Sequence, residues 1–360
     1  MKNKIAKSIG VLGLASLMTT TAHAQLTISG YAEAGFTTGS TSGTLGHVNS
    51  KNLGGETVIT IAGKGKLSNG WDYSAYQNFD SDDIQDGRTS TTTATQSTPM
   101  STRAIVLSPT KDFSLFYTFD GVYGGEIART AVPTVTERVG DLTGAATISE
   151  FIDVTSGHHA VGFDVNNVGP NGRFSVAYNP NLDLRPQSSS DRTSAVVNTA
   201  SGYSMGYSVS PGPITLRAGV TKIDQKQSAT AKDVTSKTLG VTFTQAPFAI
   251  GAQRTKNDSV KIARTTADTY DDQVDTIAAS FAATKELTIG ATYSTMERSG
   301  AAIPTTGPDL KVTQLVVAYN LGPVVISGAY EDAKNKAQAN AATLSGLDSQ
   351  TAKIKVKANF

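Results

Sequence analysis

Few groups of side chains in this sequence have the types and spacing that enzyme chemistry needs. His158 and His159 are adjacent on an expected strand, so their rings point to opposite faces and cannot bind one metal ion together. Lys64-Gly65-Lys66 lacks the second glycine and the following Ser or Thr of a phosphate-binding loop. No serine stands with a histidine and an aspartate in a recognisable local motif. The sequence therefore predicts no enzymatic activity and no catalytic residue.

Two acidic clusters could bind a cation, because hard cations such as Ca²⁺ favour clustered carboxylates. The first comprises Asp80, Asp82, Asp83 and Asp86, and the second comprises Asp268, Asp271, Asp272 and Asp275. Neither has the Asp-x-Asp-x-Asp-Gly spacing of a calcium loop. Solvated acidic loops are the favoured interpretation, with loop-bound calcium as the alternative. No other metal or cofactor is expected.

The N-terminus has the pattern of a secretory signal peptide. Three lysines precede the apolar run 9–18, and Ala22-His23-Ala24 forms a small-residue cleavage site. Cleavage after Ala24 would leave residues 25–360, with 28 basic and 30 acidic residues and a formal net charge of −2. This balance argues against a nucleic-acid partner. The chain has no cysteine, so thiol catalysis, disulfides and Cys-ligated zinc are excluded.

After residue 24 the chain is a series of short segments in which apolar and polar residues alternate. The segment from Leu26 to Phe36 has this period-2 pattern, and so does the C-terminal stretch, where Ile354 and Val356 alternate with lysines before the terminal Phe360. No stretch has a helical period of useful length, and no apolar run approaches the length of a membrane-spanning helix. The pattern predicts an all-β chain.

The expected connections between segments alternate between short and long. The short turns lie at 68–70, 108–112, 168–172, 211–213, 246–247, 285–286 and 322–323, and are rich in Gly, Pro, Asn and Asp. The long polar loops lie at about 39–54, 81–99, 121–156, 181–193, 224–235, 257–270, 298–309 and 334–348. Fifteen connections predict sixteen antiparallel strands, and eight long loops favour a closed transmembrane β-barrel over a soluble sandwich.

The chain resembles the Gram-negative general porin family. The resemblance rests on the start Leu26-Thr27-Ile28-Ser29-Gly30-Tyr31, on Ala34-Gly35-Phe36, on the strand rhythm, on the long third loop, and on the end Lys355-Val356-Lys357-Ala358-Asn359-Phe360. One departure is Gly121-Val122-Tyr123-Gly124-Gly125-Glu126, where many members carry a Pro-Glu-Phe-Gly-Gly-type turn. The resemblance implies an outer-membrane homotrimer of sixteen-stranded barrels, each narrowed by an inward-folded third loop.

The resemblance also implies partners and an assembly signal. Phe360 would be recognised by the β-barrel assembly machinery, and the barrel would lie in outer-membrane lipid. The two acidic clusters themselves suggest a bridge through divalent cations to lipopolysaccharide at the outer surface. The first strands and the last would face the trimer axis, where both faces of the segment from Arg103 to Leu107 could be buried. Cleavage after Ala24 also places the new ammonium group of Gln25 on the strand that pairs with the last one, so an ion pair with the Phe360 carboxylate is expected.

A barrel of sixteen strands is too wide for side chains alone to fill, so a polar, water-filled lumen is expected. Face counting places ten charged side chains in it: Lys64, Lys66, Arg173, Arg217, Lys353, Lys355, Lys357, Glu33, Asp72 and Asp164. The third loop adds seven more: Glu126, Arg129, Glu137, Arg138, Asp141, Glu150 and Asp153. Nine basic against eight acidic groups predict only a weak preference for anions.

The favoured function is passive diffusion of ions and small hydrophilic solutes through this lumen. Two alternatives stay open: an outer-membrane adhesin or structural barrel whose lumen is plugged, and a substrate-specific channel for sugars or anions. The third loop, with Gly pairs, few large apolar residues and several charges, favours the open channel. No evident row of aromatic residues indicates a sugar path.

Overall fold

The structure is a computed structural model and describes residues 25–43, 46–82, 100–136, 151–155, 158–182, 200–224, 233–261, 269–299, 309–335 and 348–360. The expected signal peptide, residues 1–24, lies outside these residues. Within them, no helix is both long and apolar enough to cross a membrane.

The described residues form sixteen strands and one short 3₁₀ helix. The strands are β1 (Gln25–Gly43), β2 (Gly46–Lys66), β3 (Asp72–Asp82), β4 (Met100–Thr110), β5 (Phe113–Phe119), β6 (His159–Asn166), β7 (Arg173–Leu182), β8 (Ala200–Val209), β9 (Ile214–Asp224), β10 (Val234–Gln245), β11 (Phe248–Lys261), β12 (Thr269–Ala282), β13 (Leu287–Ser299), β14 (Leu310–Asn320), β15 (Val324–Lys334) and β16 (Asp348–Asn359). The helix η1 spans Gly124–Ala128.

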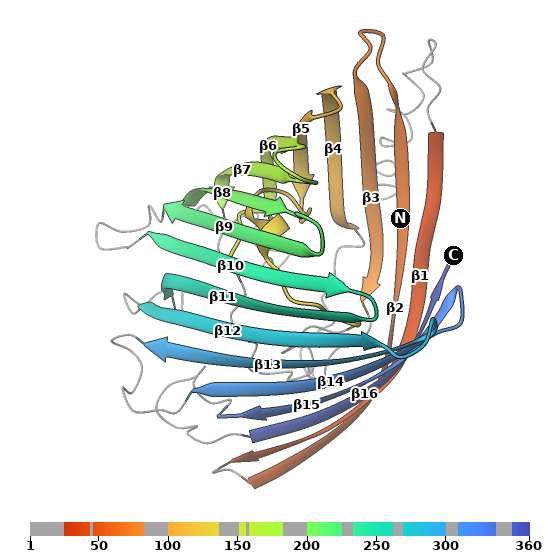
Figure 1. The fold of residues 1–360 in the computed structure, drawn as a ribbon, viewed down its shortest axis with the longest axis vertical. Helices are drawn as coiled ribbons and strands as arrows, with labels where there is room; N and C mark the ends of the chain where they lie inside the picture. Colours follow the sequence, from red (N-terminus) through yellow and green to blue (C-terminus); the bar gives the residue numbers. More distant parts are fainter. Residues whose placement is uncertain are drawn as a thin grey trace, which may run out of the picture.

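Every strand pairs antiparallel with its neighbours in sequence, and β1 pairs with β16, so the sheet closes into a barrel (Figure 1). Closure gives each of the sixteen described strands a neighbour on both sides. The predicted fold class, an all-β antiparallel barrel of sixteen strands, is confirmed.

The strand register separates an outer and an inner face. On β14, Leu315, Val317 and Tyr319 are exposed on the outer face, while the residues between them are buried on the inner face. Ile277 and Tyr293, which are paired across β12 and β13, belong to the same outer face. The apolar half of each alternating segment therefore covers the outside of the barrel, as the period-2 pattern predicts.

The seven short turns lie where the sequence predicts them, but the first long loop does not. Residues 39–54 were expected to form a loop; instead β1 and β2 pair without interruption from Gly39↔Ser50 to Gly43↔Gly46. With 19 and 21 residues, β1 and β2 are longer than the other described strands. Its Ser, Thr and Asn residues suit water on both faces, and a paired strand exposed to water needs no apolar face. A polar composition was therefore misread as a loop.

The last strand closes the barrel through Phe360. Its N–H donates to Gly30 O at 3.0 Å, and the N–H of Gly30 donates to Phe360 O at 3.0 Å. The expected ion pair between the chain start and this carboxylate is wrong. Gln25 lies opposite Lys64, five residues before Gly30, which is about 17 Å along an extended strand.

The inner face is not polar throughout, contrary to the expected polar lumen. Val274, Met296, Leu310, Val312 and Ala333 form a buried apolar cluster on the inner side of β12 to β15. Register pairs such as Met296↔Leu310 show that these side chains share that face. Because full burial of apolar atoms is favourable, this part of the wall is a packed core.

Candidate functional site: the lumen and the segment folded into it

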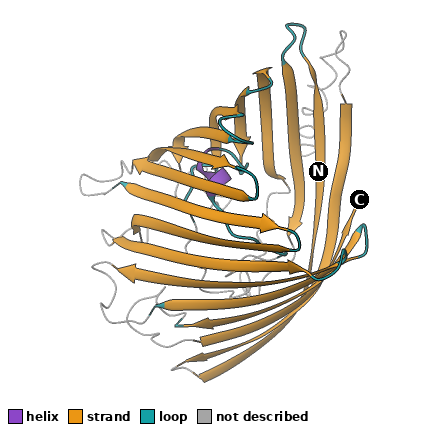
Figure 2. Ribbon diagram, in the orientation of Figure 1, coloured by secondary structure: helices purple, strands orange, loops and turns teal. Residues whose placement is uncertain are grey.

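A segment between β5 and β6 runs inside the barrel. Its described parts are residues 120–136 and 151–155, and η1 lies in the first part, against β7, β8 and β9 (Figure 2). Tyr123 precedes η1 and stacks on Phe116 of β5, with ring centroids 4.2 Å apart. Burial raises the pKa of Tyr123 to about 12. We call residues 120–136 and 151–155 the inward segment.

Five inner-face glycines of the barrel form a bed for the inward segment. A Cβ atom added at any of them would lie within about 3 Å of that segment. Gly206 would meet Gly124 O at 2.4 Å, Gly219 would meet Ala128 Cβ at 3.1 Å, Gly240 would meet Ala131 Cβ at 2.1 Å, Gly251 would meet Pro133 Cδ at 2.9 Å, and Gly290 would meet Val135 Cγ2 at 2.4 Å. These glycines lie on β8, β9, β10, β11 and β13, so the segment follows more than a third of the inner wall.

Polar side chains of the same wall bind the backbone of the inward segment. Gly124 N–H donates to Ser175 Oγ at 2.7 Å, and Gly125 N–H donates to Ser204 Oγ at 3.0 Å. Farther along, Gln253 accepts from Ala131 N–H at 2.8 Å and donates to Arg129 O at 2.6 Å. The returning part is held at Ile152, whose N–H donates to Ser236 Oγ at 3.0 Å.

Both predicted lumen arginines of this wall bind the inward segment. Arg173 forms an ion pair with Asp164 at 2.8 Å and donates to Val122 O at 3.1 Å. Arg217 donates to Thr130 O. Their positive charges are thus placed against backbone carbonyls and, for Arg173, a carboxylate. Face counting placed them on the correct face but did not predict this holding role.

Asp153 links the returning part of the segment to β8. Its Oδ1 accepts from Ser204 Oγ at 2.8 Å and from Thr155 N–H at 2.9 Å, and the residue is 5% exposed. Burial raises the pKa of this carboxyl from 3.8 to about 6, against the opposing effect of these hydrogen bonds. Gly202-Tyr203-Ser204-Met205-Gly206 fits a Gly-x-Ser-x-Gly pattern, but it lies inside β8 and not on a strand-to-helix turn, so the nucleophile-elbow geometry is not present.

The wall formed by β16, β1, β2 and β3 carries the other predicted charges. Lys355 lies 3.4 Å from Glu33, and Lys357 Nζ lies 3.2 Å from the centre of the Tyr31 ring. Tyr31 donates to Glu56 at 3.0 Å, which adds a carboxylate that was not among the expected lumen residues. The cross-strand pairs Glu33↔Lys357, Gly35↔Lys355 and Thr37↔Lys353 place the three lysines of β16 on the face of Glu33.

Nearer the short turns, Lys66 pairs with Asp72 at 2.7 Å, and Lys64 lies two residues earlier on the same face. Of the third-loop charges, Glu126 and Arg129 form an ion pair at 2.9 Å. Glu137, Arg138, Asp141 and Glu150 lie outside the described residues.

The candidate calcium clusters do not converge where the structure describes them. Asp272 is on the inner face and pairs with Arg298 at 2.6 Å, whereas Asp275 is on the outer face and pairs with Arg254 at 2.6 Å. Asp271 accepts from Ser259 N–H at 2.7 Å. In the first cluster Asp80 is on β3 and Asp82 ends that strand, while Asp83 and Asp86, like Asp268, lie outside the described residues. No group of three possible metal ligands occurs in the described part of the chain.

Of the two adjacent histidines, the structure gives the contacts of the His159 ring. His159 begins β6 on the outer face, where its ring nitrogens lie 2.6 Å from Tyr117 Oη and 3.2 Å from Arg103 Nη2. The Arg103 guanidinium also lies over the Phe119 ring, 4.9 Å from its centre. The residue Arg103 of the expected trimer-facing segment thus belongs to an aromatic cluster on the outside of the barrel.

Solved structures with the same architecture include an outer-membrane protein and porins. A loop-deletion mutant of OmpT, an outer-membrane protein of Vibrio cholerae, superposes with a TM-score of 0.63 at 10% identity, over 94% of this chain and 99% of that one. An anion-selective porin from Comamonas acidovorans gives 0.61 at 15% identity, over 94% and 100%. A mutant porin of Rhodopseudomonas blastica gives 0.59 at 15% identity, over 93% and 100%. The chain has the fold of the porins.

No family model matches the sequence, and no curated protein matches it. At such low identity the likeness is one of fold, and pore residues cannot be transferred from these porins by position. The function of this chain therefore has to be argued from its own inner wall.

Proposed function

We propose that the chain forms a water-filled channel in the outer membrane of a Gram-negative bacterium, for passive diffusion of ions and small hydrophilic solutes. The observation that carries the proposal is that the inward segment packs against one side of the barrel wall. Residues 124–135 lie in the glycine bed of β8 to β13, while the lysines of β16 and the charges of β1 to β3 stand on other strands. The glycines let the segment lie close to the wall, which leaves lumen for water.

The proposed lining combines cations and anions in nearly equal number. It comprises Glu33, Lys64, Lys66, Asp72, Lys353, Lys355 and Lys357 of the strands, and Glu126, Arg129, Glu137, Arg138, Asp141, Glu150 and Asp153 of the third loop. Arg173 and Arg217 bind that loop, and Asp164 pairs with Arg173. Ion pairs such as Lys355–Glu33 cancel much of the field at distances beyond about one Debye length, 8 to 10 Å. A weak preference for anions follows, since the β16 lysines are the largest group of one sign.

The assembly that we propose is a homotrimer in the outer membrane, in contact with lipid and lipopolysaccharide. Phe360 would be the signal for the barrel-assembly machinery. Its backbone closes the sheet against Gly30, and the residue is 63% exposed, so that another protein could bind it.

An adhesin or structural barrel is the second candidate, and one observation favours it. The inner side of β12 to β15 is a packed apolar core, as expected of a lumen that is partly filled. A substrate-specific channel is a narrower form of the first proposal, and no aromatic row of the described inner face supports it.

Liposome swelling separates the two candidates. Purified protein in vesicles should admit arabinose and glucose at rates that fall with solute size, and at equal rates for sugars of equal size. Entry of no sugar would contradict the channel and support the adhesin. Saturable entry of one sugar would support the substrate-specific form.

A further inference from the structure

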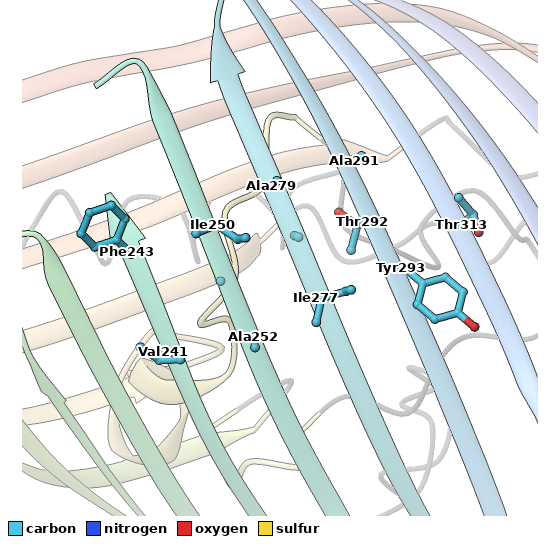
Figure 3. A pocket seen from close by; sticks show the side chains of 12 residues that line it. Val241, Phe243, Ile250, Ala252, Ile277, Ala279, Ala291, Thr292, Tyr293 and Thr313 are labelled. Atoms are coloured by element: carbon cyan, nitrogen blue, oxygen red, sulfur yellow. The ribbon is translucent and has the colours of Figure 1, made fainter. Parts of the chain in front are cut away.

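The outer face of the barrel is hollowed at β10 to β14 (Figure 3). The depression has a volume of about 500 Å³, and an adjoining one of about 600 Å³ shares Val241, Ala252, Ile277 and Tyr293 with it. The two therefore form one continuous hollow, which we call the outer groove. It lies outside the lumen, because its large side chains belong to the face opposite the glycine bed.

Small residues on three neighbouring strands create the groove. Ala279 lies opposite Ala291 on β13 and opposite Ile250 on β11, and Ala252 lies in the next row. Larger side chains stand around this floor, as Figure 3 shows for Phe243, Ile250, Ile277 and Tyr293. The rim and floor are almost entirely apolar, so the natural occupant is a hydrocarbon chain.

One end of the groove carries an exposed ion pair. Arg254 Nε and Nη2 donate to the two carboxylate oxygens of Asp275 at 2.6 and 2.9 Å, and the Arg254 side chain is 64% exposed. Tyr293 lies one row below, on the side of the apolar residues. Aromatic side chains of this kind mark the membrane interface, and a charge on the outer wall is least costly there. The pair thus stands at the level of lipid headgroups.

Three cationic side chains lie close together at the same end. Lys237 and Lys256 lie directly opposite each other on β10 and β11, one row beyond Arg254. Lys256 pairs with Asp258 at 3.3 Å, Arg254 pairs with Asp275, and Asp271 lies one row farther on β12, where it accepts from Ser259 N–H. Glu297 is two strands away from Lys256, beyond Gln273. Opposed like charges destabilise a sheet unless an anion lies between them.

We propose that the outer groove binds one acyl chain of an anionic phospholipid, with the phosphate held by Arg254, Lys237 and Lys256. Arginine has five N–H donors, of which Asp275 takes two, and the remaining donors suit phosphate oxygens. Ile250 and Arg254 are four residues apart, about 13 Å along the strand, which lets the chain lie between them. The inference rests on the proposed membrane location but not on conduction through the lumen.

Tryptophan quenching by brominated lipids tests the site. The chain has a single tryptophan, so Trp71→Phe gives a silent background for one probe, Ile250→Trp at the groove or Ile326→Trp on the outer face of β15. Each protein is placed in phosphatidylcholine vesicles containing either brominated phosphatidylglycerol or brominated phosphatidylcholine. At Ile250→Trp, the anionic lipid should be preferred about tenfold, the size of one charge-assisted hydrogen bond. At Ile326→Trp the two lipids should quench alike.

Two further variants distinguish the contribution of the headgroup contacts from that of the apolar groove. Arg254→Gln together with Asp275→Asn removes both charges and should abolish the preference while quenching persists. Ala279→Leu fills the floor and should also abolish it. Equal quenching by both lipids at Ile250→Trp overturns the proposal. Absence of quenching at Ile250→Trp, when Ile326→Trp is quenched, overturns it too and indicates that a second copy of the chain covers the groove. Absence of quenching at both probes overturns the membrane location as well. Solute entry into vesicles, measured on the same variants, should not change.

Discussion

Gly240→Ala is expected to push the inward segment off its bed. The added Cβ would lie 2.1 Å from Ala131 Cβ, whereas carbon atoms in contact lie about 3.5 to 4.0 Å apart. The backbone of β10 is held by β9 and β11, so the segment must move by about 1.5 to 2 Å, the difference between these distances. The only direction open to it is away from the wall, into the lumen.

The size of the effect follows from two contributions. Overpacking of a buried site costs about 1 to 3 kcal/mol. Movement of Ala131 also lengthens its hydrogen bonds with Gln253 and Thr242, each worth about 1 kcal/mol. If the segment moves away, the overpacking is relieved but the hydrogen bonds are weakened, so the two contributions do not add in full. We therefore expect Gly240→Ala to lower the free energy of unfolding by about 1 to 3 kcal/mol. The single-channel conductance should fall, because the lumen becomes narrower.

Urea unfolding in lipid vesicles and single-channel recording measure the two effects. Gly63→Ala is the matched control, since nothing lies within 4 Å of a Cβ added there. Ala131→Gly in the Gly240→Ala background should restore both quantities, because the next atoms then lie 3.3 and 3.5 Å from the added carbon. An equal fall of conductance in Gly63→Ala would refute the close packing of the segment against Gly240. So would a stability and conductance that stay low when Ala131→Gly is added.

Three further expectations concern charge, pH and assembly. Lys357→Glu should shift the reversal potential in a salt gradient toward cations, whereas Lys311→Glu, on the outer face of β14, should not; equal shifts would contradict the assigned faces. The raised pKa of Asp153 means that the folded protein binds the proton more tightly, so stability should fall as pH rises from about 4 to 6. In urea titrations, the free energy of unfolding of the unmodified protein should fall by up to about 3 kcal/mol over this range, and that of Asp153→Asn should not. The same pH dependence in both proteins would count against the burial argument. Deleting Phe360 should reduce the assembled, heat-modifiable form on unboiled gels, and full assembly without it would remove its role as a signal.

The alternation of residues was sufficient to predict the barrel. Period-2 segments between Leu26 and Phe36 and before Phe360 fix which side chains share a face, and turn residues such as Pro247 fix where strands reverse. The same counting placed Lys64, Lys355 and Lys357 on the inner face. What alternation cannot show is whether a polar strand is paired, which is why the β1–β2 hairpin was taken for a loop.

The contacts of the inward segment could not be predicted, because they depend on strands far apart in sequence. Gly206, Gly219, Gly240 and Gly251 occupy inner-face positions of four consecutive strands, and this recurrence is a signal that sequence alone carried. The recurrence of glycine can be explained only from the structure, in which one segment crosses the four strands at these positions. For the same reason Arg217 was predicted only as a charge in the lumen, whereas it donates a hydrogen bond to a backbone carbonyl of the segment.

Planar-bilayer recording tests the central claim most directly. The purified protein, added to one side of a lipid bilayer in a salt gradient, should produce discrete, long-lived conductance steps with a reversal potential displaced only slightly toward anions. Each step should be the same size, as expected of one fixed lumen. A protein that inserts into the bilayer without producing steps would contradict the account, because the inward segment would then close the barrel rather than line a pore.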